Sequence, residues 1–220
     1  MAAPRSRDEE WMSRAEWQRR HQGLKDRAKQ GGVDLLLLGD SITEAWPTTG
    51  RAAFEKHLLP LKAAAFGIGG DMTQHLLWRL QLGECEGLQP KLVALLIGIN
   101  NFGHQGDSPL QVAQGVLSVV GEIRRRWLNA HVALLNLLPD GDLPSDPARQ
   151  RVSAANQRLA AHPYGPAVSF LDHSNVFLLS DGRLDRALLP DGVHPTEAAY
   201  ELWAQALAPE FRALLAEPPK

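Results

Sequence analysis

Val33-Asp34-Leu35-Leu36-Leu37-Leu38-Gly39-Asp40-Ser41-Ile42 joins a largely apolar run to a glycine, an aspartate and a serine. A short apolar run of this kind is typical of a strand that is buried on both faces inside a parallel sheet. Residues that follow such a strand lie at the carboxyl edge of the sheet, where open α/β sheets hold their sites. The stretch therefore predicts an α/β protein with Ser41 at a functional edge.

The rest of the chain alternates apolar runs with helix-compatible stretches and shows no internal repeat. After the strand at 33–38, further strands are expected at 63–66, 92–97, 131–137 and 168–171, and helices at 14–29, 72–82, 109–127, 148–161 and 195–215. This alternation predicts βαβ units and a three-layer α/β/α fold around a parallel five-stranded sheet. We expect a single domain over residues 1–220. Residues 1–30, which contain Trp11 and Trp17, are expected to pack on it as a helical segment.

Composition restricts the class of partner. The chain has 220 residues, of which 44% are hydrophobic, so it can bury a core without metals or disulfides. Its net charge of -2, without a long block of one sign, gives no surface for nucleic acid or anionic membranes. The single cysteine, Cys85, is expected to be buried filler. No apolar run is long enough to span a membrane, and no secretory signal is evident, so we expect a cytoplasmic protein unless a leader was trimmed.

A second motif, Asp191-Gly192-Val193-His194-Pro195, lies near the end of the chain. A serine hydroxyl is a weak nucleophile at neutral pH and needs an imidazole to accept its proton. We expect Ser41 to be the nucleophile and His194 the general base, held in place by Pro195. Asp191, three residues earlier, is placed to accept a hydrogen bond from Nδ1 and so select the reactive tautomer. The two motifs together predict a serine hydrolase.

Such a reaction also needs donors for the oxyanion that forms on the attacked carbonyl. Gly69-Gly70 follows the second expected strand, and Gly98-Ile99-Asn100-Asn101 follows the third. The expected donors are the backbone N–H groups of Ser41 and Gly70 and the side-chain amide of Asn100. All of them fall on the same edge of the sheet as the nucleophile.

Five blocks, in order, carry a family resemblance. They are Gly39-Asp40-Ser41-Ile42-Thr43, Phe66-Gly67-Ile68-Gly69-Gly70-Asp71, Leu77-Trp78-Arg79-Leu80, Gly98-Ile99-Asn100-Asn101 and Asp191-Gly192-Val193-His194-Pro195. In these blocks the chain resembles the GDSL, or SGNH, hydrolase superfamily, most closely the branch of the intracellular platelet-activating-factor acetylhydrolase catalytic subunits. The resemblance implies a flavodoxin-like fold, the triad and oxyanion donors named above, and no metal or cofactor. Asn101, where many members have aspartate, supports this branch. Because the subunits of this branch form dimers, the resemblance also implies a homodimer. In a dimer the N-terminal segment could pack on a neighbouring subunit, but our default expectation is that it packs on its own domain.

Individual residues have simpler interpretations. Ser41 alone is compatible with a helix N-cap, and Asp71 with another. Asp40 is expected to brace its loop through backbone hydrogen bonds. Asn100 alone fits a turn, and Gly70 fits a backbone conformation closed to other residues. Of the other histidines, only His104 lies near a motif, where it would line the entrance.

The substrate is the least constrained part of this interpretation. In the acetylhydrolase branch the acyl pocket is small. Side chains expected to line it here are Trp46, Met72, Asn101, Phe102 and Val193. The resulting hypothesis is a carboxylester hydrolase that acts on small-molecule esters of short acyl groups, acetyl first, through an acyl-serine intermediate. Alternatives are a thioesterase or lysophospholipase with the same residues, a flavodoxin-like binding module whose loop 41–43 cradles phosphate or flavin, and an inactive scaffold.

Overall fold

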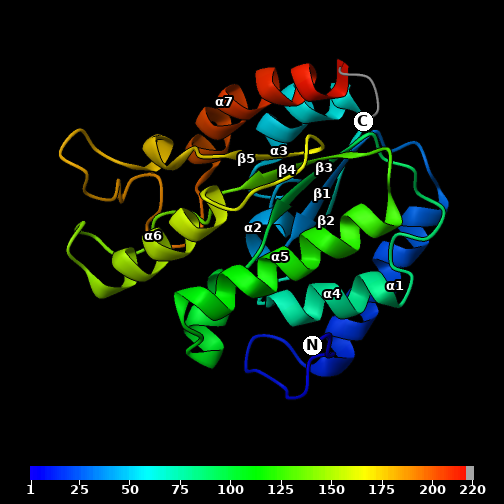
Figure 1. Ribbon diagram of the computed structural model, residues 1–220, viewed down its shortest axis with the longest axis horizontal. Coiled ribbons are helices and arrows are strands. Elements are labelled where there is room, and N and C mark those ends of the chain that lie inside the picture. Colours follow the sequence, from blue (N-terminus) through cyan, green and yellow to red (C-terminus); the bar gives the residue numbers. More distant parts are fainter. Residues whose placement is uncertain (217–220) are drawn as a thin grey trace.

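The computed structural model describes residues 1–216 as one parallel five-stranded sheet with helices on both faces (Figure 1). The strand order is β2-β1-β3-β4-β5. The strands are β1 (Leu35–Gly39), β2 (Ala63–Gly67), β3 (Leu92–Leu96), β4 (His131–Leu135) and β5 (Val168–Leu171). The predicted three-layer α/β/α fold is confirmed. Residues 217–220 of the expected domain lie outside the described part of the chain.

The helices form two layers. α7 (Glu197–Ala216) covers one face together with the short α3 (Arg51–Ala53) and η1 (Phe54–Leu58), while α4, α5 and α6 cover the other face, with α1 beside α4 (Figure 1). These helices are α1 (Arg14–Lys29), α4 (Thr73–Gln81), α5 (Pro109–Arg126) and α6 (Pro147–Ala160). Local signals set the ends of several of them. Ser108 caps α5, for example, by accepting a hydrogen bond from Gln111 N–H, and Pro109 occupies its first turn.

The core explains why the strand sequences are so apolar. Every residue of β1, β3 and β4 is buried, because each of these strands has a neighbour on both sides and a helical layer on both faces. The edge strand β5 is only half-buried. The N-terminal helix adds a second cluster, in which Trp17 packs with Met12 and Ile68. The N-terminal segment therefore packs on its own domain, as expected by default, and Cys85 is buried and unpaired.

The strand order places the site. The chain runs from β1 outward to β2 and returns to β3 on the other side of β1, so the order reverses between β1 and β3. Ligands of open α/β sheets bind outside the carboxyl ends of the strands at such a reversal. α2 (Ser41–Glu44) begins there, directly after β1. It lies so close to β2 that a Cβ on Gly67 would meet Asp40 O and Glu44 N at 2.3 Å.

Most expected elements agree with the structure to within about two residues. β1 begins at Leu35, two residues later than expected, because the preceding Asp34 turns toward Lys62 and Lys91 as a surface ion pair. The structure adds short helices that the sequence pattern did not predict, including α2 and the run from α3 to η2 (Leu59–Leu61). Among residues 1–216, no helix is both long enough and apolar enough to cross a bilayer.

Candidate active site

Three predicted residues meet at the carboxyl edge of the sheet. Ser41, at the first position of α2, places Oγ 2.9 Å from His194 Nε2, although 153 positions separate the two in the chain. His194 Nδ1 lies 2.6 Å from Asp191 Oδ2. The imidazole thus bridges a hydroxyl and a carboxylate, each at hydrogen-bond distance. This is the geometry in which an imidazole can accept a hydroxyl proton while the carboxylate fixes its tautomer.

Asp191 is held by its own loop. Its Oδ1 accepts hydrogen bonds from the backbone N–H groups of Val193 at 2.9 Å and His194 at 2.8 Å. Partial burial acts to raise the pKa of Asp191, but these two bonds and the imidazole contact outweigh it and lower the pKa to about 2. Asp191 is therefore ionised at any pH at which the protein is expected to work.

Asp40, not Ser41, is the N-cap of α2. Its side chain accepts a hydrogen bond from Ile42 N–H at 3.1 Å, which confirms the predicted bracing role and makes the N-cap interpretation of Ser41 wrong. Asp40 is fully buried, and burial raises its pKa to about 7, with the nearby Asp71 carboxylate adding to the effect. Ionising the carboxyl group of this N-cap residue in the folded protein therefore costs free energy.

This burial predicts a pH dependence of stability. Between the unfolded pKa of 3.8 and the folded pKa of about 7, the folded protein binds the proton of Asp40 more tightly, so stability falls as pH rises through this window. Asp40→Asn keeps the acceptor for Ile42 N–H and removes the ionisation. Relative to the unmodified protein, we expect Asp40→Asn to have a free energy of unfolding that is more favourable to the folded state at pH 8 than at pH 5 by on the order of 2–4 kcal/mol. Urea unfolding at the two pH values measures this.

The control for that experiment is Asp34→Asn, which removes a carboxylate at the opposite end of β1. It should not reproduce the pH-dependent gain. If Asp40→Asn changes the free energy of unfolding equally at pH 5 and pH 8, the carboxyl group is not the source of the pH dependence.

Two backbone N–H groups at this edge have no acceptor within residues 1–216. They belong to Ser41, at the start of α2, and to Gly70, after β2. Gly70 has a φ of +71°, which favours glycine, and a Cβ there would lie 2.0 Å from the Trp11 ring. Free N–H groups beside a hydroxyl are the donors that an oxyanion requires.

Asn100 brings a third donor to the same place. Its Nδ2 donates to Asp71 O at 3.0 Å and lies 3.4 Å from Asp40 Oδ2. The second distance is long for a hydrogen bond, so one of the two amide hydrogens is only weakly engaged. The carbonyl bond holds the amide between the loops that follow β1 and β2. Asn100 is thus more than the turn residue that its sequence context allows.

A buried charge network supports these loops. Asp71 accepts hydrogen bonds from Trp17 Nε1 and Arg79 Nε, both at 2.7 Å, so it is not the helix cap that the sequence allowed. Arg79 also contacts Glu84 and donates to Gly39 O at 3.1 Å. Glu84 in turn contacts His21 Nδ1 at 2.8 Å. Burial raises the pKa of Asp71 to about 6, and Arg79 and the hydrogen bond from Trp17 oppose this shift.

The residues predicted to line the substrate pocket separate into two groups. Met72 and Val193 are half-buried, and each lines a cavity, Met72 together with Gly70 and Val193 together with Ile42. Trp46 is 3% exposed and packs in the core against Tyr200 and Trp203, and Phe102 is 5% exposed in the same core. Their apolar character thus serves packing beneath the site.

Asn101 is 2% exposed, and its side chain is used within the protein. Its Oδ1 accepts a hydrogen bond from Thr73 N–H at 3.0 Å, and its Nδ2 donates to Asp107 at 2.9 Å. These bonds tie the turn after β3 to the start of α4. Asn101 therefore lies behind Asn100 and not on the pocket wall.

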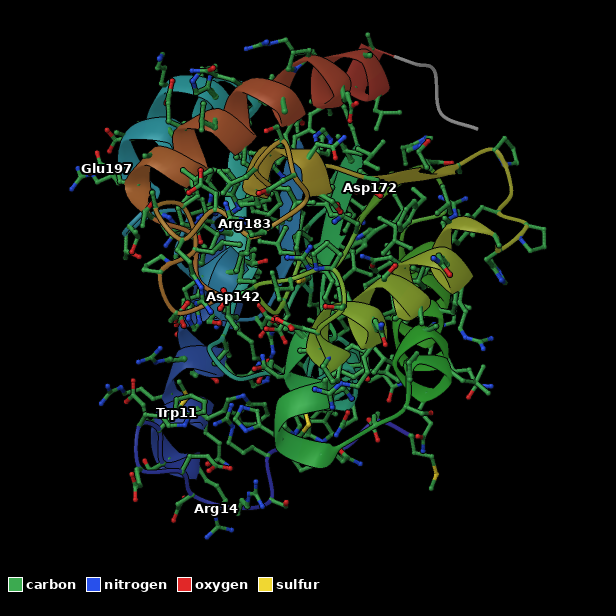
Figure 2. The ribbon with its side chains drawn as sticks, turned by 90° about the vertical axis from the view of Figure 1, so that its left-hand side faces the viewer. Trp11, Arg14, Asp142, Asp172, Arg183 and Glu197 are labelled. Atoms are coloured by element: carbon green, nitrogen blue, oxygen red, sulfur yellow. The ribbon has the colours of Figure 1, made fainter. Side chains whose placement is uncertain are left out.

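Two spaces are lined by residues next to Ser41 and His194 in the chain or by Gly70. A narrow recess of about 10 Å³ lies between α2 and the loop of Asp191, and its lining includes Ile42, Ile99, Leu138, Pro139 and Val193. A larger cavity of about 380 Å³ lies on the other side, next to Gly70, and its lining includes Met72, Trp11 and His104. His104 thus borders the cavity next to Gly70, and its place at the entrance stays a prediction. Figure 2 shows this side of the molecule, with Trp11 in the N-terminal segment and Asp142 and Arg183 on loops farther along the same edge.

Comparison with known proteins shows the family of the chain. The sequence profile of the GDSL-like Lipase/Acylhydrolase family matches residues 37–202. The chain belongs to this family. It is 33% identical over 202 residues to platelet-activating factor acetylhydrolase IB subunit alpha1 of Homo sapiens, covering 91% of this chain and 85% of the relative. The chain is accordingly an esterase of the GDSL, or SGNH, type.

Solved structures of family members share the fold. A GDSL-like lipase from Bacteroides thetaiotaomicron has a TM-score of 0.69 at 19% identity, covering 91% of this chain and 97% of that one. A variant of an acetylxylan esterase from Geobacillus stearothermophilus has a TM-score of 0.63 at 18% identity, covering 84% and 95%. At these identities the likeness concerns the fold alone.

Sequence reasoning missed several residues that hold this family's site together in the present chain. Glu44 Oε2 accepts a hydrogen bond from Gly69 N–H, and Arg5 donates to Gly69 O, both at 2.8 Å. Glu84 is fully buried against Arg79. Arg5 lies in a charged stretch that resembles a solvated terminus, and nothing in the sequence indicates its burial. The short spacing between Arg79 and Glu84 on either side of the end of α4 was the only available signal.

Proposed function

We propose that this chain is a serine carboxylester hydrolase that cleaves short-chain, acetyl-like esters of small molecules. Ser41 is the nucleophile, His194 the general acid and base, and Asp191 the group that orients the imidazole. The observation that carries this proposal is the continuous contact from Ser41 Oγ through His194 to Asp191, with distances of 2.9 and 2.6 Å. The backbone N–H groups of Ser41 and Gly70 and the amide of Asn100 form the oxyanion hole.

The reaction follows from these positions. His194 Nε2 takes the hydroxyl proton as Ser41 Oγ attacks the acyl carbon, and the carbonyl oxygen becomes an oxyanion that the three donors stabilise. Collapse breaks the ester bond, and the imidazolium gives its proton to the departing alcohol. Water then attacks the acyl-serine with His194 as base, and the imidazolium returns the proton to Ser41 Oγ as the bond to the acyl carbon breaks and the carboxylic acid leaves. Asp191 stays ionised throughout and stabilises the imidazolium.

The shape of the two spaces supports short acyl groups. We assign the acyl group to the recess beside Val193, whose volume of about 10 Å³ accommodates about one water-sized or methyl-sized group. The leaving alcohol is assigned to the cavity of about 380 Å³ beside Gly70 and Met72. The relative named above is an acetylhydrolase subunit, and its name fits this assignment.

A series of p-nitrophenyl esters from two to twelve carbons tests the acyl assignment. We expect the acetate to have the highest kcat/KM and each added methylene to lower it, since a methylene without space costs about 1–3 kcal/mol in an apolar site. Val193→Ala widens the recess and should raise the butyrate-to-acetate ratio by about tenfold. Preference for the longest esters in the unmodified protein would contradict the assignment. Including a thioester in the series tests the thioesterase alternative.

The predicted homodimer and the predicted cytoplasmic location remain predictions. Sedimentation at micromolar concentration measures the first, and a monomer would make it wrong. The proposed chemistry requires neither, since all the residues named above come from one chain.

A further inference from the structure

The N-terminal strap, residues 3–12, runs over the loop that carries Gly70. Ala3 N–H donates to Gln74 O at 3.1 Å, which fixes one end, and Met12 packs with Trp17 at the other. Between them, the Trp11 ring lies against Gly70 and stacks with His104 at a centroid distance of 6.1 Å. The strap therefore contacts both loops that supply oxyanion donors after β2 and β3.

Gly69, which precedes Gly70, is held at both of its peptide groups. Gly69 N–H donates to Glu44 Oε2 at 2.8 Å, from the helix that begins at Ser41. Gly69 O accepts a hydrogen bond from the Arg5 guanidinium, also at 2.8 Å, from the strap. Glu44 is itself held by Arg20 of α1 at 2.6 Å. A charged side chain thus holds each of the two peptide groups of Gly69, and the group held by Arg5 is the one that contains Gly70 N–H.

Peptide geometry connects Arg5 to that donor. Gly69 C=O and Gly70 N–H belong to one planar peptide unit, in which the oxygen and the hydrogen point in opposite directions. A donor that fixes the direction of Gly69 O therefore fixes the direction of Gly70 N–H as well. A charged donor on the carbonyl also polarises the peptide and makes its N–H a stronger donor.

Arg5 is placed to do this in a fixed orientation. It is only 7% exposed, although it is the first residue of the charged stretch at 5–10. The Trp11 ring covers the guanidinium at 5.0 Å, and the Asp71 carboxylate lies 3.8 Å from it. Burial lowers the pKa of Arg5 while Asp71 opposes the shift, and the buried Nε has no protein partner within residues 1–216. Burying the Arg5 guanidinium costs free energy, and its one short hydrogen bond is the one to Gly69 O.

We propose that Arg5 is a positioning residue of the oxyanion hole, which orients and polarises the Gly69–Gly70 peptide through Gly69 O. The proposal rests on the proposed function, in which Gly70 N–H stabilises the oxyanion. It makes the strap part of the active site. Since the oxyanion exists in the transition state and not in the bound ester, the effect of Arg5 falls on kcat and not on KM.

The test compares three variants with p-nitrophenyl acetate. Losing an oxyanion donor costs about 10²–10³ in kcat, so losing its orientation in Arg5→Met should lower kcat about 10–100-fold and leave KM within about threefold. Arg5→Lys retains a charged donor and should recover at least part of that loss. The matched control is Arg14→Met, whose exposed side chain pairs with Asp8 at the outer edge of the N-terminal segment (Figure 2) and should change kcat less than about twofold.

A second readout does not depend on catalysis. The amide nitrogen of Gly70 responds to hydrogen bonding at the carbonyl of Gly69, because both belong to the same peptide. We expect its ¹⁵N chemical shift to move in Arg5→Met and in Arg5→Lys, and not in Arg14→Met. If Arg5→Met does not fold, Arg5→Lys and Arg5→Gln supply both readouts.

The outcomes separate the two proposals. A folded Arg5→Met with unchanged kcat, or a loss confined to KM, would overturn the positioning role and leave the proposed function intact. An unmoved Gly70 shift would also overturn it. Undiminished turnover in Ser41→Ala would instead overturn the proposed function, whatever the Arg5 variants do.

Discussion

Ser41→Ala and His194→Ala are each expected to lower turnover of p-nitrophenyl acetate by about 10⁴-fold or more, without loss of fold. The hydroxyl and the imidazole act as one unit, because the proton that Ser41 gives up must pass to Nε2, 2.9 Å away. Without the base, the hydroxyl attacks too slowly to matter. Without the hydroxyl, the imidazole has no nucleophile to activate. Combining the two substitutions should therefore cost little more than either alone.

The matched control is His162→Ala, which removes an exposed histidine that makes an edge-to-face contact with Tyr164 in the turn between α6 and β5. Its turnover should equal that of the unmodified protein. Circular dichroism and thermal unfolding establish that each variant is folded. A reduction of less than tenfold in either folded Ser41→Ala or His194→Ala would contradict the assigned roles.

The largest expected effect on stability belongs to Arg79→Met. Arg79 is fully buried and holds Asp71, Glu84 and the carbonyl end of β1. Methionine preserves much of the volume but removes the guanidinium that donates hydrogen bonds to both buried carboxylates. Breaking a buried ion pair in this way costs about 3–5 kcal/mol. For a chain of this size, that corresponds to a fall in Tm of roughly 10 °C or more.

Arg125→Met is the control for Arg79→Met. It removes an arginine of the same helical layer that pairs with Glu122 and is largely exposed, and its effect on Tm should be small. A Tm for Arg79→Met within about 2 °C of the unmodified protein would contradict the network's role. Turnover of the folded fraction is expected to fall too, since Arg79 holds Gly39 O next to the loop of Ser41.

The fold was predictable because its signals are local. The buried strands are short apolar runs, and helices such as α5 begin with a serine cap and a proline, so position in the chain was enough to place them. The carboxyl-edge rule then placed Ser41, Gly70 and Asn100 together, since each follows a strand. Their spatial neighbours followed from topology and needed no knowledge of side-chain contacts.

The remaining features depend on contacts between distant parts of the chain. Arg5 and Gly69 are 64 residues apart, and Glu44 and Gly69 are 25 apart, so no periodic pattern relates them. Trp46 and Phe102 follow motif residues closely in sequence, yet their side chains turn into the core. Sequence proximity to a motif indicates which loop a residue belongs to. It does not indicate whether the side chain points from that loop into the core or toward the site.

The most direct test of the central claim is to trap the acyl-enzyme. Brief reaction with p-nitrophenyl acetate, acid quenching and peptide mapping by mass spectrometry locate any acetyl group on the protein. We predict one acetyl group, on Ser41, formed in step with a burst of p-nitrophenol and absent from Ser41→Ala. An acetyl group on another residue, or full turnover by Ser41→Ala with no adduct, would contradict the assignment of Ser41 as the nucleophile.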